Sequence, residues 1–313
     1  MQTPQSTTTT ATATASQEQL PCSAIAQKLE EPLVGTAPTA SGWLLLERPG
    51  AWGPRALEES GLIPEVATAI AWRARTKGMR VLLVRRRLGG YDSNGFSCFI
   101  ARSERSGTWM EELRIEDPAQ LLELDWQVFQ DPDPPGLGMP VASPVYLVCT
   151  HGRRDPCCGA YGRQVVHSLG YLGPRLWESS HLGGHRFAAN LACFPEALFY
   201  GRVSPATSND IVNRHERNEV EPAHLRGRSV DHPLVQAADA LIRAERNLYG
   251  IDDLVPQDRV SEEREGHFRV EFQHPSEPMS VLIRTVKAQP RRTSCATDLL
   301  ESPTSYELVG VGA

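Results

Sequence analysis

The chain has 313 residues, enough for two domains with a substantial buried core. A composition of 40% hydrophobic and 22% charged residues is typical of globular proteins, and the formal net charge of −6 argues against a broad nucleic-acid-binding surface. No apolar run approaches the roughly 18 residues that span a bilayer. Residues 1–19 are rich in Thr, Ala and Ser and show neither a signal peptide nor an Arg-rich transit peptide, so we expect a disordered tail and a cytoplasmic protein.

The first half predicts an α/β unit. An apolar strand, a Gly/Pro turn and a helix-like stretch are followed by a second helix, a second strand and a β-hairpin. The corresponding ranges are 42–62 for the strand, turn and helix-like stretch, 64–76 for the helix, 79–84 for the strand, and 95–104 with 108–117 for the hairpin.

The second half repeats this order. Residues 144–170 predict a strand, a loop and a helix, 174–180 predict a strand, and 190–203 predict two strands around a Pro-Glu turn. We therefore expect a small α/β unit used twice, with domains at 20–130 and 141–313. The Asp/Pro/Gly-rich stretch 131–140 between them is typical of a linker.

A C-terminal extension is expected to pack on the second unit. Residues 231–250 predict a helix, with Asp231 as its cap and Gly250 as its stop. Residues 267–273 alternate apolar and polar side chains, and 280–286 are expected to pair with them as a β-hairpin.

The seven cysteines favour metal or redox chemistry, because an odd number without a secretion signal does not indicate a disulfide framework. Cys149 ends a predicted strand, and Cys157 with Cys158 begins the following helix, where the helix dipole favours thiolates. His181 and His185 flank a Leu-Gly-Gly stretch, which predicts a tight loop. Cys98 and Cys193 are interpreted as ordinary buried thiols.

Several kinds of site share this inventory. The stretch 181–185 lacks the Glu of a zinc-protease helix, and the C-x-x-C spacing of a dithiol redox centre is absent. Two cysteines and two histidines are compatible with a structural zinc site, and also with a [2Fe–2S] cluster. The Rieske pattern of C-x-H and C-x-x-H does not occur here, so such a cluster would be of another type.

The residues around this constellation resemble the sucrase/ferredoxin-like family, which is related to thioredoxin-like [2Fe–2S] ferredoxins. The resemblance rests on Cys149, "RRDPCCG" (153–159) and "HLGGH" (181–185), and it extends over about 145–204. It implies two thioredoxin-like units in tandem and a non-Rieske [2Fe–2S] cluster in the second. The implied ligands are Cys149, Cys158, His181 and His185. Cys158 is preferred over Cys157 because it precedes Gly159, as the family's ligand does.

The resemblance implies an electron carrier rather than an enzyme with its own substrate pocket. No nucleotide fingerprint, phosphate loop or Ser/His/Asp motif is present in the sequence. Neutral histidine ligands raise the potential: Rieske centres span about −150 to +300 mV, against about −400 mV for all-cysteine plant-type clusters. A ligating imidazole keeps a second nitrogen, so proton-coupled electron transfer is expected. The first half, which has no equivalent cysteines, is expected to stabilise the protein or to serve in docking.

The surroundings suggest how a partner would bind. Residues 141–204 contain six Arg against three Asp or Glu, a balance of +3 within an acidic chain. Such a basic rim, including Arg153 and Arg154, would attract an acidic redox donor or acceptor. Arg186 and Asn190 are candidates for hydrogen bonds near the cluster, with loop bracing as the alternative. His151 is either a turn residue or a hydrogen-bond donor to one of the ligands.

Overall fold

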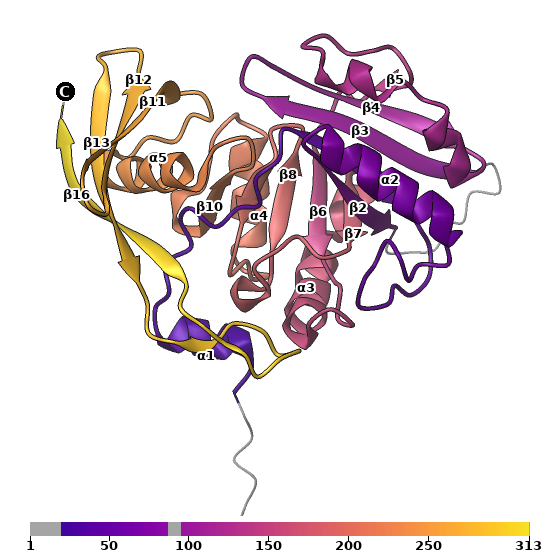
Figure 1. Ribbon diagram of the computed structural model, residues 1–313, viewed down its shortest axis with the longest axis horizontal. Coiled ribbons are helices and arrows are strands. Elements are labelled where there is room, and N and C mark those ends of the chain that lie inside the picture. Colours follow the sequence, from indigo (N-terminus) through magenta and orange to yellow (C-terminus); the bar gives the residue numbers. More distant parts are fainter. Residues whose placement is uncertain (1–19, 87–94, 313) are drawn as a thin grey trace, which may run out of the picture.

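The computed structural model describes residues 20–86 and 95–312, and the predicted tail at 1–19 lies outside this range (Figure 1). One sheet of ten strands, in the order β10-β9-β8-β6-β7-β2-β1-β3-β4-β5, runs through both halves of the chain. A second sheet, with the order β11-β12-β13-β16, lies at the C-terminal end with helix α5 against it. The mixed α/β class is confirmed.

The first half contains a parallel strand pair joined by a helix. The elements are β1 (Gly42–Glu47), α2 (Pro64–Thr76), β2 (Met79–Arg85), β3 (Phe96–Glu104) and β4 (Gly107–Ile115). Strand β1 pairs parallel with β2 and antiparallel with β3, and all six of its residues are buried. The run Trp-Leu-Leu-Leu is therefore that of a central strand covered on both faces.

The second half has the same order and the same pairings. Its elements are β6 (Val145–Cys149), α3 (Pro156–Ser168), β7 (Leu176–Ser179), β8 (Leu191–Phe194) and β9 (Leu198–Tyr200). Strand β6 pairs parallel with β7 and antiparallel with β8, as β1 does with β2 and β3. Helix α4 (Ser208–His215) and strand β10 (Leu225–Arg228) follow, with β10 completing this edge of the sheet.

The halves meet through an antiparallel pairing of β2 with β7, in which Val84 lies opposite Ser179. They also share a core, because Trp43 of β1 packs on Phe194 and Phe199 with ring centroids 5.4 and 5.5 Å apart. Phe99 of β3 likewise meets Trp177 of β7 at 5.4 Å. The predicted repeat is thus built into one sheet, and one hydrophobic cluster is shared by both halves.

The stretch at 131–140, expected to be a linker, lies along the edge of this sheet. Strand β5 (Met139–Pro140) pairs with β4. The backbone N–H groups of Gly136, Leu137 and Gly138 donate to the carboxylate of Glu111 at 2.9–3.1 Å. The carboxylate therefore fixes this loop to the strand beside it.

The C-terminal extension has more strands than the predicted hairpin. The pairing of β12 (His267–Gln273) with β13 (Met279–Lys287) is confirmed, and β11 (Val255–Arg264) and β16 (Thr304–Gly312) flank it. Helix α5 (Pro233–Arg246) covers this sheet. The chain between β13 and β16 includes β14 (Arg291–Arg292) and β15 (Leu300–Glu301), and it lies beside helix α1 (Cys22–Lys28) at the base of Figure 1.

Three local expectations were wrong. The helix-like stretch within 42–62 forms bends and a turn at residues 56–59 after β1, and Gly61 follows this turn with a φ of +76°. Helix α5 is capped by His232, whose Nδ1 accepts from the N–H of Leu234, while Asp231 pairs with Arg105 instead. The helix ends at Arg246, since Asn247 takes the left-handed conformation before Gly250 is reached.

Among the described residues, no helix is both long and apolar enough to cross a membrane.

Candidate metal centre

The start of helix α3 positions the two adjacent cysteines. Asp155 is the N-cap, with its Oδ1 accepting from the N–H of Cys157 at 3.0 Å, and Pro156 occupies the first helical position. Cys157 and Cys158 therefore both lie in the first turn, where unpaired N–H groups favour thiolates. The sequence prediction of cysteines at a helix start agrees with this arrangement.

Glycines bring this helix unusually close to the end of β6. A Cβ on Gly162 would lie 2.0 Å from the carbonyl oxygen of Cys149, and a Cβ on Gly159 would lie 2.9 Å from the Cα of Gly152. Only hydrogen fits at either position. Because the helix touches the backbone of the loop, the side chain of Cys158 lies close to that of Cys149.

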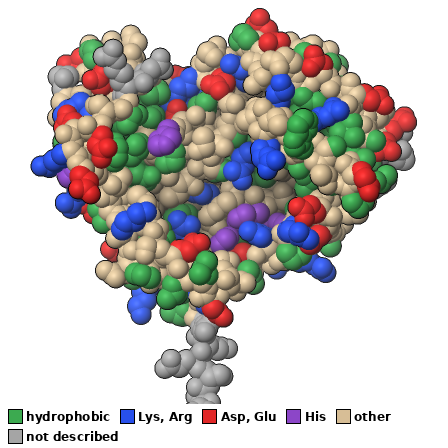
Figure 2. Space-filling model, in the orientation of Figure 1, with side chains coloured by type: hydrophobic (Ala, Val, Ile, Leu, Met, Phe, Trp, Pro, Cys, Tyr) green, Lys and Arg blue, Asp and Glu red, His purple; other side chains and the backbone are tan. Residues whose placement is uncertain are grey.

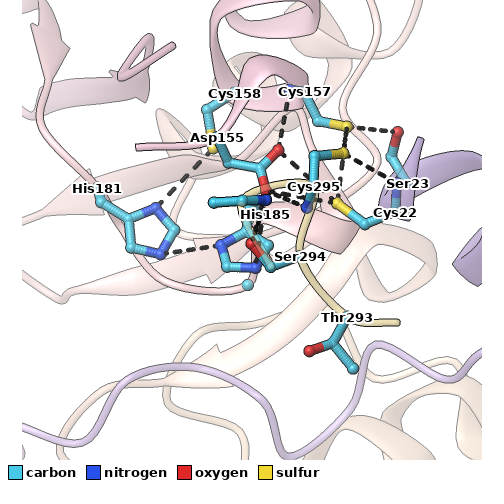
Figure 3. A network of polar contacts seen from close by, with 12 residues as sticks. Cys22, Ser23, Asp155, Cys157, Cys158, His181, His185, Thr293, Ser294 and Cys295 are labelled. Atoms are coloured by element: carbon cyan, nitrogen blue, oxygen red, sulfur yellow. Dashed lines mark hydrogen bonds and ion pairs between the residues drawn. The ribbon is translucent and has the colours of Figure 1, made fainter. Parts of the chain in front are cut away.

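The structure brings together three of the four expected ligands directly and places the fourth beside them; Figure 3 shows Cys158, His181 and His185 of this set. One ligand atom each from Cys149, Cys158 and His181 lie within 4.8 Å of one another, with His181 Nδ1 3.9 Å from Cys158 Sγ. His185 Nδ1 lies 3.4 Å from His181 Nε2, and the two rings stack. Two imidazole nitrogens bound at about 2.1 Å to one tetrahedral metal ion are about 3.4 Å apart. This spacing fits two ligands on one metal through His181 Nε2, whereas Nδ1 of the same ring faces Cys158 Sγ.

The histidine loop is shaped by two glycines and a buried arginine. Gly183 and Gly184 have φ values of +81° and +64°, which glycine adopts without strain. The carbonyl of Gly183 accepts from Arg226 at 3.1 Å, and that of Gly184 accepts from the amide of Asn190 at 3.0 Å. Arg226 also donates to Asn190 Oδ1 at 2.8 Å. Asn190 therefore braces the loop, as one of the two sequence interpretations proposed.

Arg226 carries a fully buried charge. Its hydrogen bonds among the described residues go to oxygens of Thr36, Gly183 and Asn190, all of them neutral. Burial lowers the pKa of Arg226 to about 9, while the sulfurs of Cys149 and Cys158 oppose this shift. Among the described residues, no carboxylate pairs with Arg226, and the sulfurs of Cys149 and Cys158 are the groups that favour its charged form.

Cys149 and His185 have protonation states that suit metal binding, whereas the contact with Cys149 raises the pKa of the Cys158 thiol, which would have to lose its proton when a metal ion binds. A hydrogen bond from Cys158 lowers the pKa of the Cys149 thiol well below its usual value, against the effect of burial. Burial lowers the pKa of His185, so its imidazole is neutral at physiological pH. Thiolate and neutral imidazole are the forms in which these side chains bind metal ions.

The first half covers this site. His151 Nε2 contacts the carbonyl of Gly53 at 2.8 Å, and its ring meets Trp52 edge-on. The carbonyl of Leu83 accepts from the N–H of Ser180, whose hydroxyl in turn accepts from the N–H of Leu83. The cysteine loop and the histidine loop are therefore both anchored to the first half.

Cys157 faces away from this site. Its Sγ lies 3.7 Å from Cys22 Sγ and 3.6 Å from Cys295 Sγ, and the hydrogen bond from Cys22 lowers its pKa to about 6 in spite of burial. With Asp155 these three cysteines form a second group of potential ligands within 4.8 Å. The sequence analysis missed this group, since residues 22 and 295 share no local pattern.

Arg186 does not contribute to the site through a hydrogen bond to a ligand. Its guanidinium pairs with Glu31 at 2.8 Å, and Glu31 also binds Arg291. This network ties the segment after α1 and the C-terminal segment to the histidine loop. Loop bracing is thus the role of Arg186.

Two cysteines and two histidines thus converge near a buried arginine in this chain. The sucrase/ferredoxin-like family model matches residues 33–227, so the chain belongs to this family. The matched range contains both halves of the large sheet and the four converging side chains. No solved structure matches the chain.

Three curated fungal relatives are named altered inheritance of mitochondria protein 32. The protein from Eremothecium gossypii is 31% identical over 107 residues, covering 29% of this chain and 34% of that protein. The protein from Candida glabrata is 27% identical over 97 residues, covering 26% and 31%. The Meyerozyma guilliermondii protein is 30% identical over 84 residues, covering 23% and 30%. The chain thus spans about a third of the length of these relatives.

The histidine loop gives a matched pair of substitutions. A Cβ on Gly184 would lie 2.6 Å from Arg226 Nη2, whereas a Cβ on Gly183 meets nothing within 4 Å. Both Gly→Ala changes incur backbone strain of about 1–2 kcal/mol. Gly184→Ala adds a clash with a buried, hydrogen-bonded side chain, which costs a further ~1–3 kcal/mol.

We therefore expect Gly184→Ala to lower the free energy of unfolding clearly more than Gly183→Ala. Chemical denaturation followed by circular dichroism measures the difference. Equal destabilisation by the two variants would contradict the packing of Arg226 against this loop.

Proposed function

We propose that the protein is an electron carrier that binds a non-Rieske [2Fe–2S] cluster through Cys149, Cys158, His181 and His185. The observation that supports this most is the convergence of two thiols and two imidazoles in a chain of the sucrase/ferredoxin-like family. When bound, the cluster would supply one-electron redox chemistry at this point of the sheet. The residues around the cluster would influence its reduction potential, its proton exchange and the docking of partners.

The buried cation has a defined part in this proposal. Two thiolates and two neutral imidazoles leave the cluster with little net charge when it is oxidised and one more negative charge when it is reduced. Arg226 is buried next to the thiolates, so its positive charge favours the more negative form. It would act with the histidines to raise the potential above that of all-cysteine clusters.

The exposure of the ligands suggests the side on which electrons and protons enter. Cys149 and Cys158 are fully buried, whereas His181 and His185 are partly exposed. Figure 2 shows histidine side chains near the middle of this face, with Lys or Arg side chains beside them. An imidazole edge that reaches solvent can exchange a proton as the cluster changes its charge.

A basic hollow beside the cysteine loop supports docking of an acidic partner. A cavity of about 530 Å³ is lined by Trp52, His151 and three arginines, namely Arg85, Arg153 and Arg163. Arg153 and Arg163 are exposed at its rim. Positive side chains next to a redox centre speed the encounter with a negatively charged donor or acceptor.

The proposal also concerns the two repeated halves of the fold. We infer that the two repeated halves, with proposed boundaries at 20–130 and 141–313, are thioredoxin-like units, of which the first stabilises the second. We also propose that the protein acts in the cytoplasm. The names of the fungal relatives refer to mitochondria, which makes cell fractionation the test of the location.

A structural zinc site is the second candidate. The group of Cys149, Cys158 and His181 favours it, because three ligand atoms within 4.8 Å of one another suit a single ion that takes one further ligand. A two-iron group held by all four side chains requires the His181 ring to turn away from that sulfur. The two candidates differ in what the purified protein contains.

Metal and sulfide analysis separates them. Protein purified without oxygen should be red-brown and contain about two irons and two acid-labile sulfides per chain. Cys158→Ser should lose this iron, whereas Cys193→Ser, which removes a buried thiol on β8, should keep it. His185→Cys should keep a cluster at a lower potential. Colourless protein with zinc at these four residues would contradict the proposal.

The reduction potential should fall as the pH rises. Reduction adds negative charge, which raises the pKa of a ligating imidazole above its value in the oxidised protein. A proton is then taken up with the electron, giving a slope approaching about 59 mV per pH unit. Potentiometric titration between about pH 6 and 10 measures the slope. The His185→Cys variant, with one imidazole fewer, should show a weaker dependence, and a flat titration of the unmodified protein would rule out proton coupling.

A further inference from the structure

A second cluster of metal-binding side chains lies on the other side of the first turn of α3 (Figure 3). It consists of Cys22 at the start of α1, Asp155 and Cys157 at the start of α3, and Cys295 in the segment after β14. One ligand atom from each of the four lies within 4.8 Å of the others. Three distant parts of the chain therefore converge on one point.

The distances between these atoms match a tetrahedral zinc site. Cys157 Sγ lies 3.7 Å from Cys22 Sγ and 3.6 Å from Cys295 Sγ. Two sulfurs bound to one tetrahedral zinc at about 2.3 Å are about 3.8 Å apart. Cys22 Sγ lies 3.7 Å from each oxygen of Asp155, and a sulfur and a carboxylate oxygen on the same ion would be about 3.6 Å apart.

The groups around these atoms donate hydrogen bonds to them, as the surroundings of anionic metal ligands do. The N–H of Cys22 donates to Cys295 Sγ at 3.2 Å, and the hydroxyl of Ser23 donates to Cys157 Sγ at 3.1 Å. Asp155 Oδ2 accepts from the N–H of Cys295 at 2.8 Å and from the hydroxyl of Ser294 at 3.1 Å. The donors fix the orientation of the ligands before a metal ion arrives.

The burial of these four side chains also favours a bound cation. Asp155 and Cys22 are fully buried, Cys157 is nearly so, and Cys295 is partly exposed. A carboxylate and three sulfurs packed together in the interior are costly to keep anionic unless a positive charge neutralises them. The partly exposed Cys295 offers a path by which an ion can enter.

We propose that Cys22, Asp155, Cys157 and Cys295 form a site for one zinc ion, separate from the proposed cluster. Zinc binding displaces the thiol protons to solvent and requires no oxidant. The ion would hold α1 and the C-terminal segment on the start of α3, linking residues that are 273 positions apart. Fixing such distant segments to one point removes much conformational freedom from the unfolded chain.

The site also lies next to the proposed cluster. Asp155 Oδ2 is 3.9 Å from His185 Nε2, so the same carboxylate faces both groups. Zinc at this site would fix the carboxylate that lies behind a cluster ligand. A disulfide between two of the three cysteines is the competing arrangement, and it would need a sulfur–sulfur distance of about 2.05 Å and leave the third thiol beside a buried carboxylate.

The adjacent cysteines allow a direct test by elemental analysis. The full chain, expressed with both metals available and purified without oxygen, should contain about one zinc per chain in addition to any iron. Cys157→Ser should lose the zinc and keep the iron, whereas Cys158→Ser should lose the iron and keep the zinc. Cys98→Ser, which removes a buried thiol in β3, is the control and should keep both metals.

X-ray absorption at the zinc edge tests the ligands in the unmodified protein, so the proposal stays testable if a variant fails to fold. The expected shell is three sulfurs at about 2.3 Å and one oxygen at about 2.0 Å. Iron-containing protein without zinc would overturn the proposal, as would a disulfide between two of the three cysteines in mass spectra under non-reducing conditions. Zinc is counted separately from iron, so failure of this site is distinguishable from failure of the electron-carrier proposal.

Discussion

The hydrogen bonds of Asp155 are the constraint on which both metal-binding groups depend. This buried carboxylate caps α3 through the N–H of Cys157 and holds the C-terminal segment through the N–H of Cys295 and the hydroxyl of Ser294. Burial alone would raise its pKa, but these donors outweigh it and keep the pKa below its usual value. The carboxylate therefore stays ionised and fixes the first helical turn.

The geometry of that turn explains why two neighbouring thiols face different groups of potential ligands. Consecutive residues on an α-helix point about 100° apart, so Cys157 and Cys158 cannot both face one small site. Cys158 faces Cys149 and His181, and Cys157 faces Cys22 and Cys295. A pair of adjacent cysteines at a helix start is thus suited to two metal groups placed back to back.

The order of the main elements and three of the converging side chains could be predicted from the sequence. The strand–helix–strand–hairpin order of each half followed from apolar periodicity, and the convergence of Cys149, Cys158 and His181 followed the family's motif. Local pattern could not reveal Asp231 binding Arg105 rather than capping α5, because that choice depends on a residue far away in the chain. For the same reason Cys22 and Cys295 gave no signal, since only the folded chain brings them together.

Contacts from the first half fix the position of the histidine loop in the second half. Strand β2 pairs with β7 and so fixes the start of the histidine loop, while the loop at Trp52 and Gly53 covers His151. Arg226 reaches the same loop from β10 and bonds to Thr36 of the first half. The position of the histidines is therefore set in part by residues from both halves that lie outside the Cys/His motif.

Electron paramagnetic resonance of the dithionite-reduced protein, with pulsed detection of nitrogen couplings, tests the central claim most directly. The account predicts the signal of a reduced [2Fe–2S] cluster with strongly coupled nitrogens from two imidazoles. In the His185→Cys variant, one of these couplings should disappear. A protein that gives no such signal after anaerobic purification, or a cluster signal without strongly coupled nitrogen, would contradict it.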